Sequence, residues 1–211
     1  AGLDSSGRTE LLENIFGSAT RKSGKIYKNG QLVGNKTPRE SIKNGFALVT
    51  EERRATGILG ILDIRANTVI ASLKKYLNGP FVSDTKMADA TDSMIKAMRI
   101  KTPNQQTKIN TLSGGNQQKV IFGRWILTQP DVLLLDEPTR GIDVGAKYEI
   151  YQLIQDLAKQ GKAVVMVSSE MPELLGVCNR IVVMSGGRVA GEVDADNTTQ
   201  EEIMTLAAKY A

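Results

Sequence analysis

A chain of 211 residues with 41% hydrophobic side chains can bury a substantial core, and this length favours one domain or one domain with a small appendage. Its 27 Lys and Arg against 23 Asp and Glu leave a net charge of +4 that is mild and scattered, which argues against a nucleic-acid partner. With no histidine, the chain alone lacks histidine acid-base catalysis and histidine metal ligation, and its single cysteine, Cys178, excludes an internal disulfide and is expected to be a small buried thiol.

Short elements separated by turn signals are predicted over the first 60 residues. A loop of small residues at 2–9 leads directly into an amphipathic helix, and the Asn29-Gly30 pair is typical of a hairpin turn. The run at 37–40 has the threonine cap, proline and glutamate of a helix start, and Gly45 ends this helix. The expected elements are a helix at 9–16, strands at 25–27 and 31–33, a helix after Thr37 and a buried strand at 46–49.

From residue 61 to about 109 the pattern is mainly helical, and it predicts a helical insertion with Met87, Met94, Ile95 and Met98 on apolar faces. The remainder alternates between helices and apolar strands, which predicts an α/β fold with a mainly parallel sheet flanked by helices. The expected elements are helices at about 115–127, 144–159 and 172–177, strands at 132–135, 163–167, 181–184 and 188–193, and a last helix capped by Thr198 with Glu201. The predicted organisation is a partial core at 1–60, the insertion at 61–111 continuing to about 128, and a second core part with a C-terminal hairpin and helix at 129–211.

The apolar strand at 132–135 is followed by two acids, Asp136 and Glu137, and then by a proline. In open parallel sheets ligands bind at the carboxyl ends of the strands, so a metal-bound nucleotide would sit here. Asp136 would hold Mg²⁺, directly or through water, and Glu137 would polarise the water that attacks the terminal phosphate. An isolated Asp-Glu-Pro is also compatible with a solvated strand end before a proline turn.

The run LSGGNQQ at 112–118 precedes a predicted helix. Ser113 and the glycine amides would lie at the positive N-terminus of this helix, where a bound phosphate is favoured. A serine cap with a flexible lead-in explains Ser-Gly-Gly in most proteins, but the longer string favours a phosphate-binding segment.

Together these segments resemble the ABC ATPase family, in which an LSGGQ-like signature is followed by a short helix and then by the strand with its acid pair. The loop at 139–143 resembles the one that couples the two sites of an ABC dimer, with Asp143 as its aspartate. The resemblance implies the P-loop NTPase fold of the ABC type, with ATP and Mg²⁺ as ligands and ATP hydrolysis coupled to transport. The runs LSGGNQQKV and LLLDEPTRGIDVGAKYEIY look like the second nucleotide-binding half of importers for monosaccharides such as galactose and methylgalactoside.

The P-loop of that family would correspond to residues 2–9. This segment keeps the glycine-rich turn and the Thr9 hydroxyl for Mg²⁺, but Arg8 stands where a lysine reaches the β- and γ-phosphates. The planar fork of arginine does not simply replace a compact ammonium. The resemblance implies that nucleotide is contacted by Gly2, Asp4, Ser5, Ser6, Gly7, Arg8 and Thr9, and by Ser113, Gly114, Gly115, Asn116, Gln117, Asp143 and Ser169.

Two further positions depart from the family pattern. Glu51 stands where a glutamine would touch Mg²⁺ and water, which adds negative charge near phosphate, although the charged run at 51–54 is equally compatible with a solvated, salt-bridged loop. Ser169 stands where a switch histidine would contact the γ-phosphate. Since a serine hydroxyl is shorter and uncharged, the site around this P-loop is expected to have lost efficient hydrolysis.

In ABC dimers ATP lies between the P-loop of one half and the signature of the other. The resemblance therefore implies that this chain completes a competent site on a partner, the N-terminal nucleotide-binding half or another ABC half, while its own P-loop site is degenerate. It also implies membrane permease subunits as partners, reached through the helical insertion and the segment after Glu51, and a periplasmic or extracellular sugar-binding protein as an indirect partner. The alternatives are a non-catalytic regulatory ABC module and a soluble ABC machine of DNA repair or translation, and the mild charge argues against the latter.

No apolar run reaches the roughly 18 residues that span a bilayer, and no signal pattern opens the chain, so a cytoplasmic location is expected. The resemblance to importer ATPases implies that the chain lies on the inner face of the cell membrane. A P-loop normally follows a buried strand, yet only Ala1 precedes Gly2, so the first strands of the fold are expected to be missing. The P-loop is then expected to be disordered, or held by a neighbouring molecule or a rearranged strand. Hydrolysis by the isolated chain is expected to be weak or absent.

Overall fold

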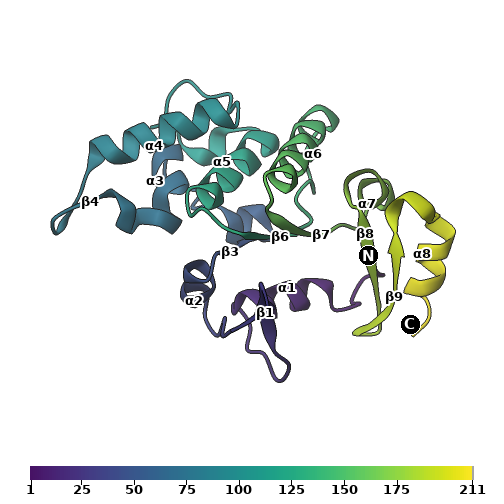
Figure 1. Ribbon diagram of the computed structural model, residues 1–211. Helices are drawn as coiled ribbons and strands as arrows, with labels where there is room; N and C mark the ends of the chain where they lie inside the picture. The colour runs from purple at the N-terminus through teal and green to yellow at the C-terminus, as the bar shows by residue number, and fades with distance from the viewer. Residues whose placement is uncertain (211) are drawn as a thin grey trace.

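A computed structural model describes residues 1–210, and its centre is a three-stranded parallel sheet in the order β3-β6-β7 (Figure 1). The strands are β3 (Phe46–Val49), β6 (Val132–Asp136) and β7 (Ala163–Val167). Leu134 of β6 pairs with Leu48 on one side and with Val165 on the other. The parallel sheet predicted from the alternating pattern is confirmed.

Helices cover both faces of the sheet. Successive residues of β6 point to opposite faces and are apolar, so each face has side chains to bury. Leu134 packs with Leu12 and Phe16 of α1 (Arg8–Phe16) on one face. Leu133 and Leu135 pack on the other face, against apolar residues of α5 (Gly114–Ile126) and α6 (Val144–Lys159). Apolar layers thus cover both faces of β6, the strand that ends at Asp136.

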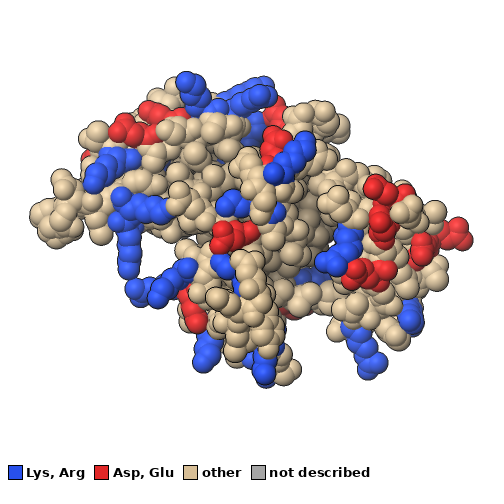
Figure 2. All heavy atoms as spheres, in the orientation of Figure 1, with Lys and Arg blue, Asp and Glu red and all other residues tan. Residues whose placement is uncertain are grey.

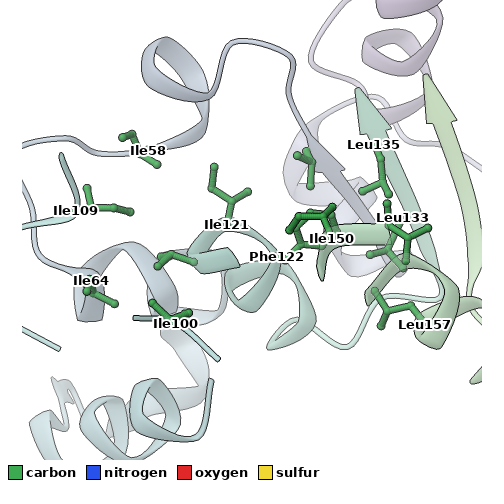
Figure 3. Packing of buried hydrophobic residues seen from close by; sticks show 13 residues of the cluster. Ile58, Ile64, Ile100, Ile109, Ile121, Phe122, Leu133, Leu135, Ile150 and Leu157 are labelled. Carbon is green, nitrogen blue, oxygen red and sulfur yellow. The ribbon is translucent and has the colours of Figure 1, made fainter. Parts of the chain in front are cut away.

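The helical region shares its core with the sheet. It contains α3 (Ile64–Val69), a 3-10 turn (Ile70–Tyr76) and α4 (Asp84–Ala97), followed by α5. Figure 3 shows one apolar cluster that runs from Ile64 and Ile109, through Ile121 and Phe122, to Leu133 of the sheet. The segment at 61–128 therefore packs as one body with the core, and the division into three parts stays an interpretation.

One element of this region differs from the mainly helical pattern expected at 61–109. Strands β4 (Leu77–Asn78) and β5 (Phe81–Val82) form a small antiparallel hairpin that protrudes at one end of the molecule (Figure 1). Gly79 adopts a φ of 62°, which an L side chain rarely adopts. The Asn-Gly pair at 78–79 is the same turn signal as the one at 29–30, and it ends the helical run.

The predicted hairpin near the start of the chain is confirmed as β1 (Ile26–Lys28) and β2 (Gln31–Val33), which pair antiparallel. The short helix α2 (Pro38–Lys43) follows, and the Thr37 hydroxyl accepts a hydrogen bond from the Glu40 amide. The Glu40 carboxylate reaches the amide of Lys36, one residue before the position expected for a capping box.

The last part of the chain contains α7 (Met171–Val177), β8 (Arg180–Ser185), β9 (Arg188–Asp194) and α8 (Gln200–Ala207). Strands β8 and β9 form a separate antiparallel sheet. The expected cap of the last helix was wrong by one residue, because Thr199, not Thr198, accepts from the amide of Glu202. With this start, Ile203 and Ala207 both face the core and are fully buried.

The first two residues pair with β8. The Ala1 amine donates to the carbonyl of Val182 at 2.9 Å, the amide of Met184 donates to the carbonyl of Ala1 at 2.9 Å, and Gly2 forms a parallel bridge with Met184. A disordered P-loop, or one held by a neighbouring molecule or a rearranged strand, was expected; the structure instead has an ordered loop whose first two residues pair with β8 of the same chain.

None of the helices within residues 1–210 is long and apolar enough to cross a membrane. Figure 2 shows basic and acidic side chains spread over the same face of the molecule, as the scatter of charge along the sequence predicts.

Candidate functional site

A cleft of about 630 Å³ opens where β6 and β7 end, a size typical of ligand-binding clefts. Its lining brings together most of the residues predicted for the nucleotide site, although they lie far apart in the sequence. The lining residues are Asp4, Ser5, Ser6, Gly7, Arg8, Thr9, Glu10, Glu51, Glu137, Arg140, Val167 and Ser169. Glu10, Arg140 and Val167 are the members that sequence reasoning did not include.

The loop before α1 forms one wall of the cleft. Ser5 and Gly7 have positive φ values of 62° and 89°, which bend the backbone into the first turn of the helix. The first amides of α1 have no partner within the helix, and they carry its positive end. Ser6 is 3% exposed, and its hydroxyl has no hydrogen-bond partner among residues 1–210. Free donors and a positive helix end are what an anionic phosphate requires.

Arg8 is held by the protein itself. Its side chain is only 11% exposed, and one guanidinium nitrogen donates to the carbonyl of Ser168 at 3.3 Å. A second nitrogen lies 3.8 Å from the exposed carboxylate of Asp4. The guanidinium therefore spans from the loop before α1 to the segment after β7, and it is already partly engaged before any ligand is considered.

The two acids at the end of β6, Asp136 and Glu137, have different surroundings. Asp136 is 2% exposed, and its Oδ1 has no hydrogen-bond partner among the described residues. Burial raises the pKa of Asp136, while a hydrogen bond from Thr9 and the charge of Arg8 act in the opposite direction. An unpaired carboxylate oxygen beside a threonine hydroxyl suits a hard cation that takes its remaining ligands from water and phosphate.

Glu137 lies in the cleft in a strained backbone conformation, with φ at 44°. The Ser169 hydroxyl donates to its Oε2 at 3.2 Å, so the structure brings together the predicted base and the residue at the switch position. Burial raises the pKa of Glu137, against the lowering effects of the Ser169 hydrogen bond and of Arg8. A raised pKa makes this carboxylate a stronger base than an exposed glutamate.

Glu51, the third predicted Mg²⁺ ligand, forms an ion pair with Arg140, and Glu52 lies 3.6 Å from the same guanidinium. The structure thus contains the salt-bridged loop that was one of the two interpretations of the run at 51–54, and Glu51 also lines the cleft. Within the described residues, no group of three or more acidic or cysteine side chains converges on a metal-sized site. The unpaired Oδ1 of Asp136 and the nearby Thr9 hydroxyl are groups that could hold Mg²⁺.

The signature residues lie at the start of α5. The Ser113 hydroxyl accepts from the amide of Asn116 at 3.4 Å and from the side chain of Asn116 at 2.9 Å. Gly115 packs on α6 so closely that an added Cβ would come within 2.4 Å of the Ala146 Cβ. Gln117 is 2% exposed, and its side-chain amide donates to the carbonyls of Ile109 and Leu112.

Asp143, predicted to act in the coupling loop, caps α6 by accepting from the amide of Ala146 at 3.0 Å. Within residues 1–210, the lining of the cleft contains neither Asp143 nor any residue from Ser113 to Gln117. Gly2 also lies outside this lining, since it pairs with Met184. The predicted site residues therefore form two separate groups, one around the cleft and one at the start of α5.

A buried glutamate that sequence reasoning missed connects the walls of the cleft. Glu173 of α7 has a side chain that is 3% exposed. Its carboxylate accepts from Thr139 at 2.6 Å, Tyr151 at 2.5 Å, Ser168 at 2.7 Å and Lys147 at 3.3 Å. Burial by itself would raise the pKa of Glu173, but these four donors together lower it. The segment after Glu137, through Thr139, and the segment before Ser169, through Ser168, are thus both hydrogen-bonded to the carboxylate of Glu173.

The family described as ABC transporter matches residues 1–140. The chain is 60% identical, over all 211 of its residues, to the galactose/methyl galactoside import ATP-binding protein MglA of Fusobacterium nucleatum. It is 57% identical to the protein of the same name of Mannheimia succiniciproducens, and in both cases it spans 42% of the relative's length.

Solved structures show the same fold at low sequence identity. A dimeric ATP-binding cassette bound to ADP and Pi has a TM-score of 0.78 at 22% identity, with 93% of this chain and 84% of the other covered. A nucleotide-free ATP-binding cassette from an ABC transporter has a TM-score of 0.77 at 20% identity, with 97% and 81% covered.

Proposed function

This chain belongs to the ABC transporter family, and we propose that it is an ATP-binding half of an importer for galactose or methyl galactoside. The sugar is inferred from the names of relatives that are 56 to 60% identical over the whole chain. Because the chain spans 41 to 42% of the length of these relatives, the activity of a whole subunit belongs to the proposal. The proposed location is the inner face of the membrane, in contact with permease subunits.

The proposal that this chain donates its signature to a partner's ATP site rests on the separation of the two groups of site residues. Arg8, Glu137 and Ser169 line the cleft, whereas Ser113 and the glycines after it lie outside it. A signature that does not reach the nucleotide site of its own chain is free to cover the nucleotide of a partner half. In this arrangement Ser113 and the first amides of α5 bind the terminal phosphate held by the partner.

The residues of the cleft have separate tasks toward Mg-ATP. The first amides of α1 and the Ser6 hydroxyl would bind phosphate oxygens. Thr9 of the cleft and the buried Asp136, which lies outside the cleft lining, would hold Mg²⁺, which would supply positive charge against the phosphates. Glu137 orients the attacking water and accepts its proton. The hydroxyl of Ser169 donates to Glu137 at 3.2 Å, so it is engaged with the proposed base.

We infer that this cleft hydrolyses ATP poorly for two structural reasons. Arg8 donates to the carbonyl of Ser168 and lies 3.8 Å from Asp4, so its guanidinium is already engaged by the protein, and its planar fork does not match the compact lysine ammonium that lies between phosphates. In addition, Ser169 has no charge to place on the γ-phosphate. The competent site is then the one that this chain completes on its partner.

Replacing Arg8 with lysine tests the first of these reasons. The Arg8→Lys variant is expected to bind Mg-ATP roughly tenfold more tightly, because one charge-assisted hydrogen bond to phosphate is worth about 1.5–3 kcal/mol. Isothermal titration calorimetry on the chain alone measures this change. Arg39→Lys, the same substitution at an exposed position of α2, is the matched control. Unchanged or weaker binding by Arg8→Lys would contradict the assignment of Arg8 as the defect.

A further inference from the structure

Arg53 occupies the point where three separate segments meet. It begins a short π-helical turn (Arg53–Gly57), two residues after Glu51 of the cleft lining. Turns of this kind are rare, and they frequently occur at functional sites. Burial lowers the pKa of Arg53, with a smaller contribution from the neighbouring Arg54, so its guanidinium has lost much of its water.

The guanidinium of Arg53 makes two hydrogen bonds to different segments. Its Nε donates to Oε1 of Gln117 in α5 at 3.2 Å, and its Nη1 donates to the carbonyl of Arg140 at 3.1 Å. Gln117 in turn donates to the carbonyls of Ile109 and Leu112, immediately before the signature serine. Arg53 is therefore hydrogen-bonded to α5, through Gln117, and to the loop that follows Asp136 and Glu137, through the carbonyl of Arg140.

The third contact of Arg53 is with the signature glycine itself. A Cβ added to Gly114 would lie 2.9 Å from Nη2 of Arg53 and 3.0 Å from the carbonyl oxygen of Gly141. The backbone of Gly114 is thus packed between the guanidinium and the loop at 140–141. This close approach accounts for a glycine at position 114, and it leaves little freedom for the backbone next to Ser113.

The same loop is bound to the cleft by its own arginine. The side chain of Arg140 forms ion pairs with Glu51 and Glu52, while its carbonyl accepts from Arg53. The segment at 51–53 therefore contacts both the side chain and the backbone carbonyl of Arg140. Arg140 and Glu51 line the cleft, so the contacts of Arg53 connect the cleft wall with the signature segment.

We propose that Arg53 is a positioning residue for the signature, holding the Ser113–Gly114 backbone against the loop at 140–141 in the shape that a partner's ATP requires. Arg53 does not touch the nucleotide. It acts through Gly114, through Gln117 and through the carbonyl of Arg140. This inference rests on the proposed donation of the signature to a partner half.

The test uses a partner half, defined here as a separately produced ABC ATP-binding half with a lysine P-loop whose own signature serine has been replaced by arginine. Two such halves cannot complete a site with each other, so turnover in a mixture reports the signature of this chain. Arg53→Ala is expected to lower kcat in the mixture at least roughly tenfold, because small displacements of a positioning group have large effects on rate. The KM of the mixture is expected to change less than about twofold, since the ATP is held mainly by the P-loop of the partner.

The matched control is Arg54→Ala, which removes the same charge from an exposed neighbour of Arg53. Arg53→Lys keeps the charge but offers no fork for two acceptors, so an intermediate kcat is expected from it. If Arg53→Ala does not fold, as judged by circular dichroism, Arg53→Lys provides the comparison. In a double-mutant cycle, Arg53→Ala and Gln117→Ala are expected to have less than additive effects on kcat, because they break one contact.

Two outcomes would overturn the proposal. One is a kcat for Arg53→Ala and Arg53→Lys equal to that of Arg54→Ala, and the other is a loss that appears in KM alone. Ser113→Arg in the same mixture distinguishes a wrong role for Arg53 from a failure of the proposed signature donation. If Ser113→Arg abolishes turnover and Arg53→Ala does not lower it, signature donation stands and the role of Arg53 is wrong.

Discussion

Replacing Ser113 with arginine is expected to lower ATP turnover in the mixture with the partner half by roughly 100-fold or more, the scale for losing one donor to a transition-state phosphate or oxyanion. Ser113 is exposed at the first turn of α5, and its hydroxyl accepts from Asn116. A long cation at this position would fill the space where the γ-phosphate of the partner's ATP has to sit. Steady-state phosphate release measures the loss.

The controls separate this effect from damage to the helix. Ser113→Ala removes the helix cap, worth about 1 kcal/mol, without adding bulk, and it is expected to reduce turnover less than Ser113→Arg. Ser93→Arg makes the same change at an exposed position of α4, and turnover is expected to remain within about twofold of the unmodified mixture. Full turnover by Ser113→Arg would show that the signature of this chain does not cover the nucleotide.

The second large effect is expected on stability, from the buried charge of Glu173. Glu173→Ala leaves the hydroxyls of Thr139, Tyr151 and Ser168 and the ammonium of Lys147 without their common acceptor. Breaking a buried charged network by removing one partner costs about 3–5 kcal/mol. Urea denaturation at pH 7 is expected to show a loss of this size. Glu170→Gln, at an exposed residue that contacts the same Lys147, is the matched control, with a loss under about 1 kcal/mol.

The contribution of Glu173 also depends on pH, and its sign follows from the direction of the shift. Its pKa in the folded protein lies below the ordinary value of 4.5, so the folded state binds the proton more weakly than the unfolded state. The stabilisation is therefore complete above pH 4.5 and is lost as the pH falls through the folded pKa. The difference in unfolding free energy between the unmodified chain and Glu173→Gln is expected to shrink in acid. A difference that stays constant from pH 7 to pH 3 would contradict this.

The sequence predicted the elements that carry local signals. The apolar run before Asp136, the Thr37 cap of α2 and the Asn-Gly turn at 29–30 are all found in the structure at the predicted positions. The predicted strands at 132–135 and 163–167 end shortly before Glu137 and Ser169, and the structure pairs these strands and brings the two side chains within a hydrogen bond. These signals are short-range, so a single sequence contains them.

The contacts that sequence reasoning missed join residues far apart along the chain. Glu173 meets Thr139 across 34 positions, and Arg53 meets Gln117 across 64, with no motif at either end that indicates the partner. The pairing of Ala1 with β8 spans 181 positions. The β4–β5 hairpin is different, because the Asn-Gly pair at 78–79 was a usable turn signal within a run that otherwise favoured a helix.

The most direct test of the account is ATP hydrolysis by this chain alone, by the partner half alone and by an equimolar mixture of the two. Turnover is expected only in the mixture, because the cleft with Arg8 and Ser169 hydrolyses ATP poorly and the signature with Ser113 completes the ATP site of the partner half. Comparable turnover by this chain alone, or no turnover in a mixture shown to form a complex, would contradict it.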